Sequence, residues 1–166
     1  MNSDTTLTRQ RAEMPGLEAA DAQARPRLGW LVLRFLGALA VLAAGAVHLD
    51  QYFGPYAEIP TIGTLFLVNF AAAVVITLAL VAPLEHLAGR WAGAAVAVVT
   101  LSGIALTAGS FLMLLISERT PLFGFQEPGY DPTAIALARD TEIAAVLLLA
   151  GSLVARFATK GRKLRW

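Results

Sequence analysis

The 166-residue sequence contains no cysteine, which excludes disulfide-exchange chemistry and any metal site built from thiolates. Charge is also scarce: Asp, Glu, Lys and Arg make up 15% of the chain, whereas ordinary globular domains carry about 25%. Hydrophobic residues make up 57% of the sequence. A composition so poor in charge and so rich in apolar side chains is typical of an integral membrane protein.

The few charges are segregated, and four stretches contain none of them: residues 35–47, 61–84, 91–117 and 143–155. A hydrocarbon core about 30 Å thick is crossed by about 20 helical residues. The second and third stretches reach that length alone, and the other two reach it when flanking polar residues are included. The sequence therefore predicts an all-α fold, an integral membrane four-helix bundle with helices near residues 28–49, 60–84, 90–117 and 132–157.

Local signals support these helices. Pro60 suits the first turn of a helix, and Asp131 followed by Pro132 reads as an N-cap and a first helical residue. Small residues recur at helical spacing in the first and third spans, which favours close packing between helices. They are Gly37, Ala40 and Ala44, then Gly93, Ala97, Ala105 and Gly109.

The two ends of the chain differ from the bundle, which we predict over residues 27–157. Residues 1–26 are polar and balanced in charge, so we expect a disordered cytoplasmic N-terminal segment. The apolar run that follows ends in small residues, as a signal peptide does. It is long for one, however, and further spans follow, which favours an uncleaved helix. Residues 158–166 form a basic cytoplasmic tail.

Basic residues near the span ends predict the orientation. They gather at both termini and in the second loop: Arg25, Arg27, Arg34, Arg90, Arg156, Lys160, Arg162, Lys163 and Arg165. The first and third loops carry one basic residue, Arg119, against the acidic residues Asp50, Glu58, Glu118, Glu127 and Asp131. By the positive-inside rule both termini are cytoplasmic and the acidic loops face outward. With its many Ala residues and excess of Arg over Lys, the sequence predicts a multi-pass protein of a bacterial cytoplasmic membrane, embedded in the lipid bilayer.

Polar groups from all four predicted helices fall at one depth. At 1.5 Å per residue, they lie about 21 to 25 Å above the inner ends of their helices. They are His48, Asn69, Thr107, Asp140 and Glu142. Ionisable groups inside a membrane are costly, so they are expected to face the bundle interior and to be paired. Arg139 and Glu142, three residues apart, can pair on one helix, and His48 is a second partner for Glu142.

This layer predicts an outward-facing polar pocket of roughly 300 to 1,000 Å³, the usual size for a small ligand. The expected ligand-binding residues are His48, Tyr52, Asn69, Arg139, Asp140 and Glu142. The third loop, residues 118–131, is long for a helix bundle and carries apolar aromatic residues, as lids do. Its expected lid residues are Phe123, Phe125, Glu127 and Tyr130.

Each of these residues also has a structural interpretation. His48 can cap the outer end of its helix, and Asn69 can form a helix–helix hydrogen bond. Arg139 and Glu142 can be a self-sufficient ion pair. The aromatic residues of the first and third loops can form the outer aromatic belt of a membrane protein. The common depth of these polar residues is the observation that favours a ligand-binding site over the structural interpretations.

Metal and cofactor signals are weak. His48, Asp50 and Glu142 are candidate ligands for a metal such as Zn, Mn or Fe, but no HExxH or ExxH spacing is present. The second histidine, His86, falls in the opposite loop, which disfavours a haem held by two histidines. No glycine-rich phosphate loop and no nucleophile motif is present. The sequence therefore identifies no particular cofactor, and nucleic acid is not an expected partner.

Several motifs resemble uncharacterised small four-span integral membrane proteins of high-GC Gram-positive bacteria. The resemblance lies in the pattern HL…Y..IPTIG.LFL.N from His48 to Asn69, in LFGF.E from Leu122 to Glu127, and in Glu142. It covers about residues 30 to 155 and implies the four-span architecture. It implies no activity and no ligand.

Three functions fit the sequence. The first is a membrane-embedded binding protein, such as a small transporter or redox-accessory protein, whose outward pocket takes a small ligand or cation, a lipid or a quinone. The alternative is a structural or assembly subunit that packs against a larger membrane complex or forms a homo-oligomer. An intramembrane enzyme comes third, because no nucleophile or metal motif supports it.

The orientation can be tested with reporter fusions. A reporter active only in the cytoplasm should be active after Trp166 and inactive within residues 118–131, because the basic residues flank the termini. A C-terminal reporter that is active only outside the cell would contradict this orientation.

Overall fold

The computed structural model describes residues 15–162, with side chains from residue 28 to residue 158. Seven helical elements follow one another between residues 15 and 162. They are α2 (Pro15–Gln51), the π-helical turn η1 (Tyr52–Tyr56), α3 (Pro60–Val81), α4 (Leu84–Leu87), the 3-10 turn η2 (Gly89–Trp91), α5 (Ala92–Ser117) and α6 (Pro132–Arg162). Between residues 15 and 162 there is no strand; one isolated bridge joins Leu122 to Phe125.

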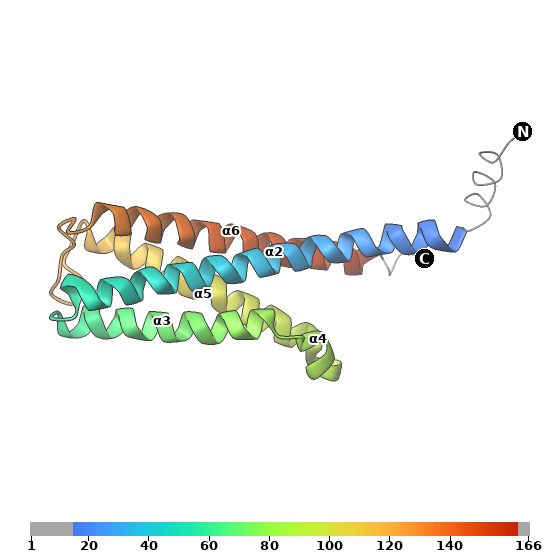
Figure 1. The fold of residues 1–166 in the computed structure, drawn as a ribbon, viewed down its shortest axis with the longest axis horizontal. Helices are drawn as coiled ribbons and strands as arrows, with labels where there is room; N and C mark the ends of the chain where they lie inside the picture. Colours follow the sequence, from blue (N-terminus) through green and yellow to red (C-terminus); the bar gives the residue numbers. More distant parts are fainter. Residues whose placement is uncertain (1–14, 163–166) are drawn as a thin grey trace, which may run out of the picture.

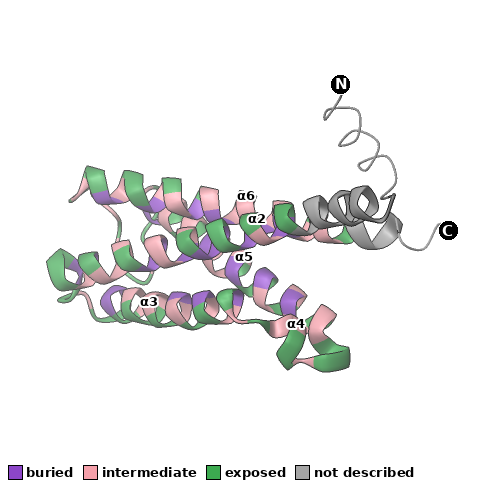
Figure 2. Cartoon of the chain, turned by 45° about the vertical axis from the view of Figure 1, so that its right-hand side comes forward, coloured by how far each residue is buried: buried purple, intermediate pink, exposed green. Residues whose placement is uncertain are grey.

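Four helical segments of this part of the chain are long and apolar enough to cross a membrane: Leu28–Tyr56, Pro60–Val81, Gly89–Ser117 and Pro132–Ala158. The predicted all-α chain with four membrane-length helices is therefore confirmed. Figure 2 shows exposed residues along the outer faces of the helices and buried residues between them. Large apolar side chains such as Leu39, Val75, Val98 and Leu147 are exposed. Lipid chains solvate such a surface, whereas water does not.

The helix bounds differ from the prediction at three places. α2 already begins at Pro15, so residues 15–26, expected to be disordered, are helical. α6 continues to Arg162, into the predicted tail. α3 ends at Val81 rather than at residue 84, because Ala82 precedes Pro83 and adopts an extended conformation (φ −62°, ψ 147°). The predictions for residues 1–14 and 163–166 lie outside the described residues.

The long helices form an antiparallel bundle (Figure 1). α2 packs against α3 and α6, and α5 closes the bundle by packing against the same two helices. η1 and residues 118–131 lie at one end, which we call the loop end, and α4 lies toward the opposite end, the α4 end. This arrangement brings the ends of α2 and α5 and the starts of α3 and α6 together at the loop end.

At the α4 end, a buried arginine pairs with a partly exposed glutamate. Nη1 of Arg34 donates a 2.6 Å hydrogen bond to Oε1 of Glu85, and Arg34 is only 3% exposed. The guanidinium groups of Arg34 and Arg156 lie over the ring of Trp30, at 5.2 and 5.3 Å from its centroid. α4 thus joins α2 through an ion pair, and Trp30 stacks with arginines from α2 and α6.

Small residues let the helices approach closely in the middle of the bundle. The buried core consists of Ala38, Val41, Ala73, Leu80, Ala145 and Leu149. A Cβ added to Gly37 would lie 2.6 Å from Cδ2 of Leu149, and one added to Gly103 would lie 2.7 Å from Cδ1 of the same side chain. Leu149 of α6 therefore fills the space above two glycines, one on α2 and one on α5.

Gly45→Ala should destabilise the bundle, because the new Cβ would lie 2.5 Å from Cβ of Ala73 and neither atom can move without a backbone shift. We expect a loss of about 1 to 3 kcal/mol, measured as a lower thermal unfolding midpoint in detergent.

The matched control is Gly151→Ala, which gives the same gain in helix propensity but places its Cβ at an ordinary 3.6 Å from Leu33. Exchanging the two residues, in the double variant Gly45→Ala/Ala73→Gly, should recover part of the loss. Equal midpoints for Gly45→Ala and Gly151→Ala would contradict the close approach of α2 and α3.

Candidate functional site

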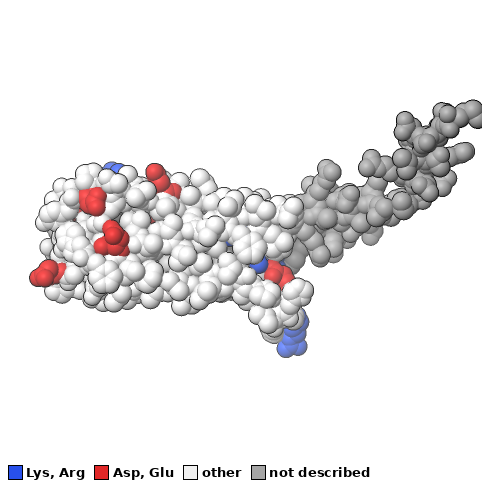
Figure 3. Space-filling view, viewed as in Figure 1, with Lys and Arg blue, Asp and Glu red and all other residues white. Residues whose placement is uncertain are grey.

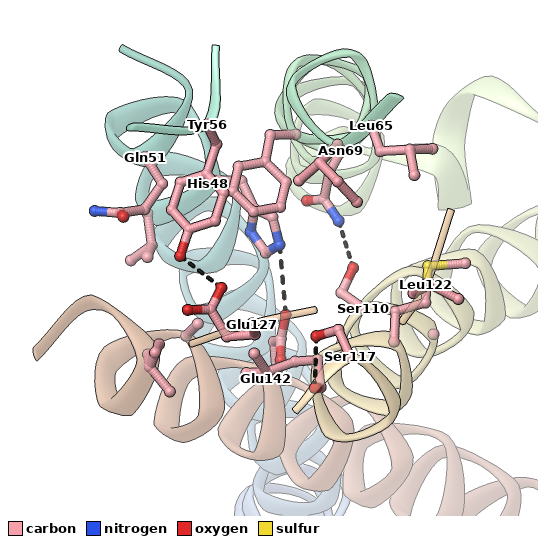
Figure 4. Close-up of a pocket in the computed structure, with 18 of the residues that line it drawn as sticks. His48, Gln51, Tyr56, Leu65, Asn69, Ser110, Ser117, Leu122, Glu127 and Glu142 are labelled. Carbon is pink, nitrogen blue, oxygen red and sulfur yellow. Dashed lines mark hydrogen bonds and ion pairs between the residues drawn. The ribbon is translucent and has the colours of Figure 1, made fainter. Parts of the chain in front are cut away.

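A cavity of about 350 Å³ lies between the four long helices at the loop end (Figure 4). Most of its lining is apolar, and eight polar side chains reach it from α2, η1, α3, α5, α6 and the loop. They are His48, Gln51, Tyr56, Asn69, Ser110, Ser117, Glu127 and Glu142. Three of the residues predicted to share one depth, His48, Asn69 and Glu142, therefore line one cavity of ligand size.

The last turn of α2 fixes the orientation of His48. Its Nδ1 lies 2.8 Å from the carbonyl oxygen of Ala44, one turn earlier in the helix. A carbonyl oxygen can only accept, so Nδ1 carries the proton and Nε2 faces the other way. The ring edge also packs on Phe66 of α3, with centroids 5.1 Å apart. His48 is thereby held by two contacts while Nε2 is directed toward Glu142 (Figure 4).

Glu142 of α6 is the buried acidic residue of the site. It is 1% exposed, and its Oε1 lies 3.8 Å from Nε2 of His48, beyond hydrogen-bond distance. Its Oε2 is buried without a hydrogen-bond partner among the described residues.

Asp131 starts α6 as predicted, because its Oδ1 accepts hydrogen bonds from the backbone N–H groups of Thr133 and Ala134 at 3.1 and 3.0 Å.

The expected pair of Arg139 with Glu142 is wrong. Arg139 forms an ion pair with Glu118 instead, at 38% and 27% exposure of the two side chains. Side chains on a helix lean toward its N-terminus, and the N-terminus of α6 lies at the loop end. Arg139 therefore extends away from Glu142, toward the residue that follows α5. The alternative partner considered for Glu142, His48, is the one that lies beside it.

Asn69 joins α3 to α5 across the cavity. Its side-chain amide donates a hydrogen bond to Oγ of Ser110, and Ser110 donates in turn to the carbonyl oxygen of Leu106 at 3.0 Å. Thr107, predicted at the same depth, is buried but does not line the cavity; its hydroxyl donates to the carbonyl oxygen of Gly103 at 2.9 Å. The polar layer thus divides into cavity groups and groups satisfied within their own helix.

The loop of residues 118–131 lines the cavity at the loop end. The hydroxyl of Tyr56 donates a 2.6 Å hydrogen bond to Oε2 of Glu127. The backbone N–H of Glu127 donates to the carbonyl oxygen of Ser117, at 2.9 Å. Phe125 packs against the Tyr56 ring at 5.8 Å and lines the cavity. Two of the predicted lid residues, Phe125 and Glu127, therefore lie where a cover would.

Other predicted site residues lie outside the cavity. Tyr52 stacks on Phe53, and Asp140 and Phe123 are exposed. Arg139 is occupied by Glu118, and Tyr130 is exposed beside Tyr56. That any of the predicted residues binds a ligand stays a prediction.

Sequence reasoning missed four of the eight polar residues that line the cavity. Gln51 follows His48 by three residues, so it lies on the same face of α2, and this spacing was a usable signal. Ser110 and Ser117 are seven residues apart on one face of α5 and could have been found in the same way. Tyr56 gave no such signal, because it follows Gly54, whose ψ of −136° breaks the helical path.

The three candidate metal ligands do not form a metal site. Asp50 is exposed and accepts a hydrogen bond from Gln51. Nowhere in the described part of the chain do three His, Asp or Glu residues gather closely enough to hold a metal ion. The reason is geometric: residues 48 and 50 are two apart in a helix and therefore point in different directions.

No protein-family model matches the sequence, and no match was found among curated proteins or solved structures. The resemblance to small four-span membrane proteins therefore stays a prediction. What the site can do follows from its geometry alone. It is an apolar cavity with one buried carboxyl group, one histidine and a few amide and hydroxyl groups.

A double-mutant cycle distinguishes the two possible partners of Arg139. Arg139→Ala and Glu118→Gln should couple by about 0.2 to 1 kcal/mol, the range of partly exposed ion pairs. Arg139→Ala and Glu142→Gln should be additive within about 0.5 kcal/mol, because these residues share no contact. Unfolding midpoints of the single and double variants in detergent measure both couplings. Coupling only in the second cycle would restore the pair predicted from the sequence.

Proposed function

We propose that the protein is a membrane-embedded binding protein, and that the cavity at the loop end holds a small, mostly apolar ligand. The observation that carries the proposal is Glu142, a buried carboxyl group with one unpartnered oxygen, on the wall of a cavity of about 350 Å³. Structural polar residues in a packed bundle satisfy one another and leave no void. Here a void of ligand size lies beside a polar group that lacks a partner.

We also propose that the loop end faces outward from a bacterial cytoplasmic membrane and that both termini are cytoplasmic. Figure 3 shows acidic side chains gathered at the loop end, whereas the basic Arg90 belongs to η2, next to α4. Arg156, Lys160 and Arg162 belong to the last turns of α6, and Lys163 and Arg165 follow them in the sequence. This asymmetry follows the positive-inside rule. A ligand would then enter from the outer side or from the outer leaflet.

The loop of residues 118–131 serves as the cover in this proposal. It is attached to the helices at several points. Glu127 contributes two of them, the Tyr56–Glu127 hydrogen bond and the backbone bond to Ser117. The others include the Arg139–Glu118 ion pair, the Gln51–Asp131 hydrogen bond and the packing of Phe125 and Tyr130 on Tyr56. Opening the cover for ligand entry requires the release of the two Glu127 bonds.

Gly109→Leu tests the cavity directly. Gly109 lines the cavity, and a Cβ added to it would meet no atom within 4 Å, so a larger side chain can fill the space without displacing the helices. We expect the wild-type protein, purified in mild detergent, to retain a small molecule in native mass spectra. The Gly109→Leu variant should lose it while keeping its unfolding midpoint.

The matched control is Gly29→Leu, because Gly29 also has no atom within 4 Å of an added Cβ but lies far along α2 from the cavity. This variant should retain the bound molecule. A wild-type protein that carries no bound molecule and is stabilised by no member of a panel of small amphiphiles would contradict the proposed function.

A further inference from the structure

The residues of the cavity wall that carry a carboxyl group are not balanced by any basic Lys or Arg side chain in the described part of the chain. Glu127 and Glu142 line the cavity, and no Lys or Arg does so among the residues with described side chains. Arg139, the nearest candidate for a compensating cation on α6, is engaged by Glu118. The wall is otherwise apolar apart from histidine, amide and hydroxyl groups. An anionic ligand would therefore meet repulsion with no basic side chain to offset it.

Two cavity-lining residues have buried oxygen atoms without a hydrogen-bond partner, and both atoms can accept a hydrogen bond. The first is Oε2 of Glu142. The second is Oε1 of Gln51, a residue that is 8% exposed. The amide orientation of Gln51 is fixed, because its Nε2 donates to carboxylate oxygens of Asp50 and Asp131, each at 3.2 Å. An unmet acceptor in a buried site is satisfied only by a donor.

His48 adds a third acceptor rather than a donor. Its Nδ1 proton is used on the carbonyl oxygen of Ala44, so in the neutral ring Nε2 offers a lone pair. Nε2 and Oε1 of Glu142 are 3.8 Å apart, too far for a direct hydrogen bond. A donor group placed near both atoms can reach each of them.

The aromatic part of the wall suits the same kind of ligand. Tyr56 packs on Phe66 at 5.0 Å and on Phe125 at 5.8 Å, and all three rings line the cavity. Aromatic faces attract cations and accommodate apolar groups equally well. They are thus compatible with a molecule that combines an apolar body with a positive charge.

We infer that the ligand of this cavity is an organic cation, an apolar body that carries one protonated amine, with the ammonium group bound between Glu142 and Nε2 of His48 and the body held among Tyr56, Phe66 and Phe125. This inference rests on the proposed function and specifies its ligand class. A neutral alcohol would also supply a donor. The ammonium group is favoured because it supplies donors and charge together, against a lining whose charged residues are acidic.

The test compares three probes of similar size on the full-length protein in detergent: phenethylamine, phenethyl alcohol and propylbenzene. Isothermal titration calorimetry, with protein-free micelles as the blank, gives their affinities. At neutral pH phenethylamine should bind at least about tenfold more tightly than phenethyl alcohol, the factor expected when a hydrogen bond becomes charge-assisted. Propylbenzene, which has no donor, should bind no better than the alcohol.

Variants test which residue causes the preference for the amine over the alcohol. Glu142→Gln should abolish the advantage of the amine over the alcohol, whereas Asp140→Asn, which removes an exposed carboxylate from the same helix, should preserve it. Gly109→Leu should weaken the binding of every probe. If Glu142→Gln does not fold, the preference of the wild-type protein for the amine and its loss in Gly109→Leu decide the question.

Two outcomes overturn the inference in distinguishable ways. Equal affinities for amine and alcohol, both reduced by Gly109→Leu, would refute the cationic ligand and leave the proposed binding function intact. If no probe binds in a manner that Gly109→Leu weakens, the cavity is not a binding site, and the proposed function fails together with the inference.

Discussion

The structure depends most on how it accommodates a carboxyl group in the interior of an apolar bundle. Glu142 lies on the inward face of α6, and its nearest described ionisable neighbour is one imidazole at 3.8 Å. Burial of such a group is costly unless it is paired and hydrogen-bonded. The surrounding helices lower this cost only in part: α2 orients His48 toward it, and α5 contributes a glycine and two serines to the cavity alongside its apolar side chains. The cavity at the loop end lies directly beside this carboxyl group.

Small residues of α5 have two opposite effects on packing. Gly37 and Gly103 are filled by Leu149, so small residues there bring helices together. Gly109, about two turns along α5 from Gly103, has no neighbour and leaves space instead. The sequence pattern predicted a small-residue packing face on this helix without distinguishing the two cases. The difference depends on which side chain the opposite helix presents at each level.

Much of the architecture could be predicted because its causes are local. The charge-free stretches set the number and length of the spans, and the Asp131-Pro132 pair set the start of α6. The common depth of His48, Asn69 and Glu142 followed from the rise per residue. The partner of Arg139 could not be predicted from spacing alone, because it depends on where α5 ends relative to α6. Likewise, nothing in the helical periodicity indicated that the chain would turn after Gly54 and bring Tyr56 over the cavity.

The position of Leu149 has a mechanical consequence. One side chain sits over glycines of two other helices, so α2, α5 and α6 are held against one another at a single level of the bundle. Toward the α4 end the Arg34–Glu85 ion pair adds a further attachment. Separation of these three helices is therefore opposed at the level of Leu149 and is easier toward the loop end. How tightly the three helices are held together at this level depends on Gly37 and Gly103, because a larger residue at either position would displace Leu149.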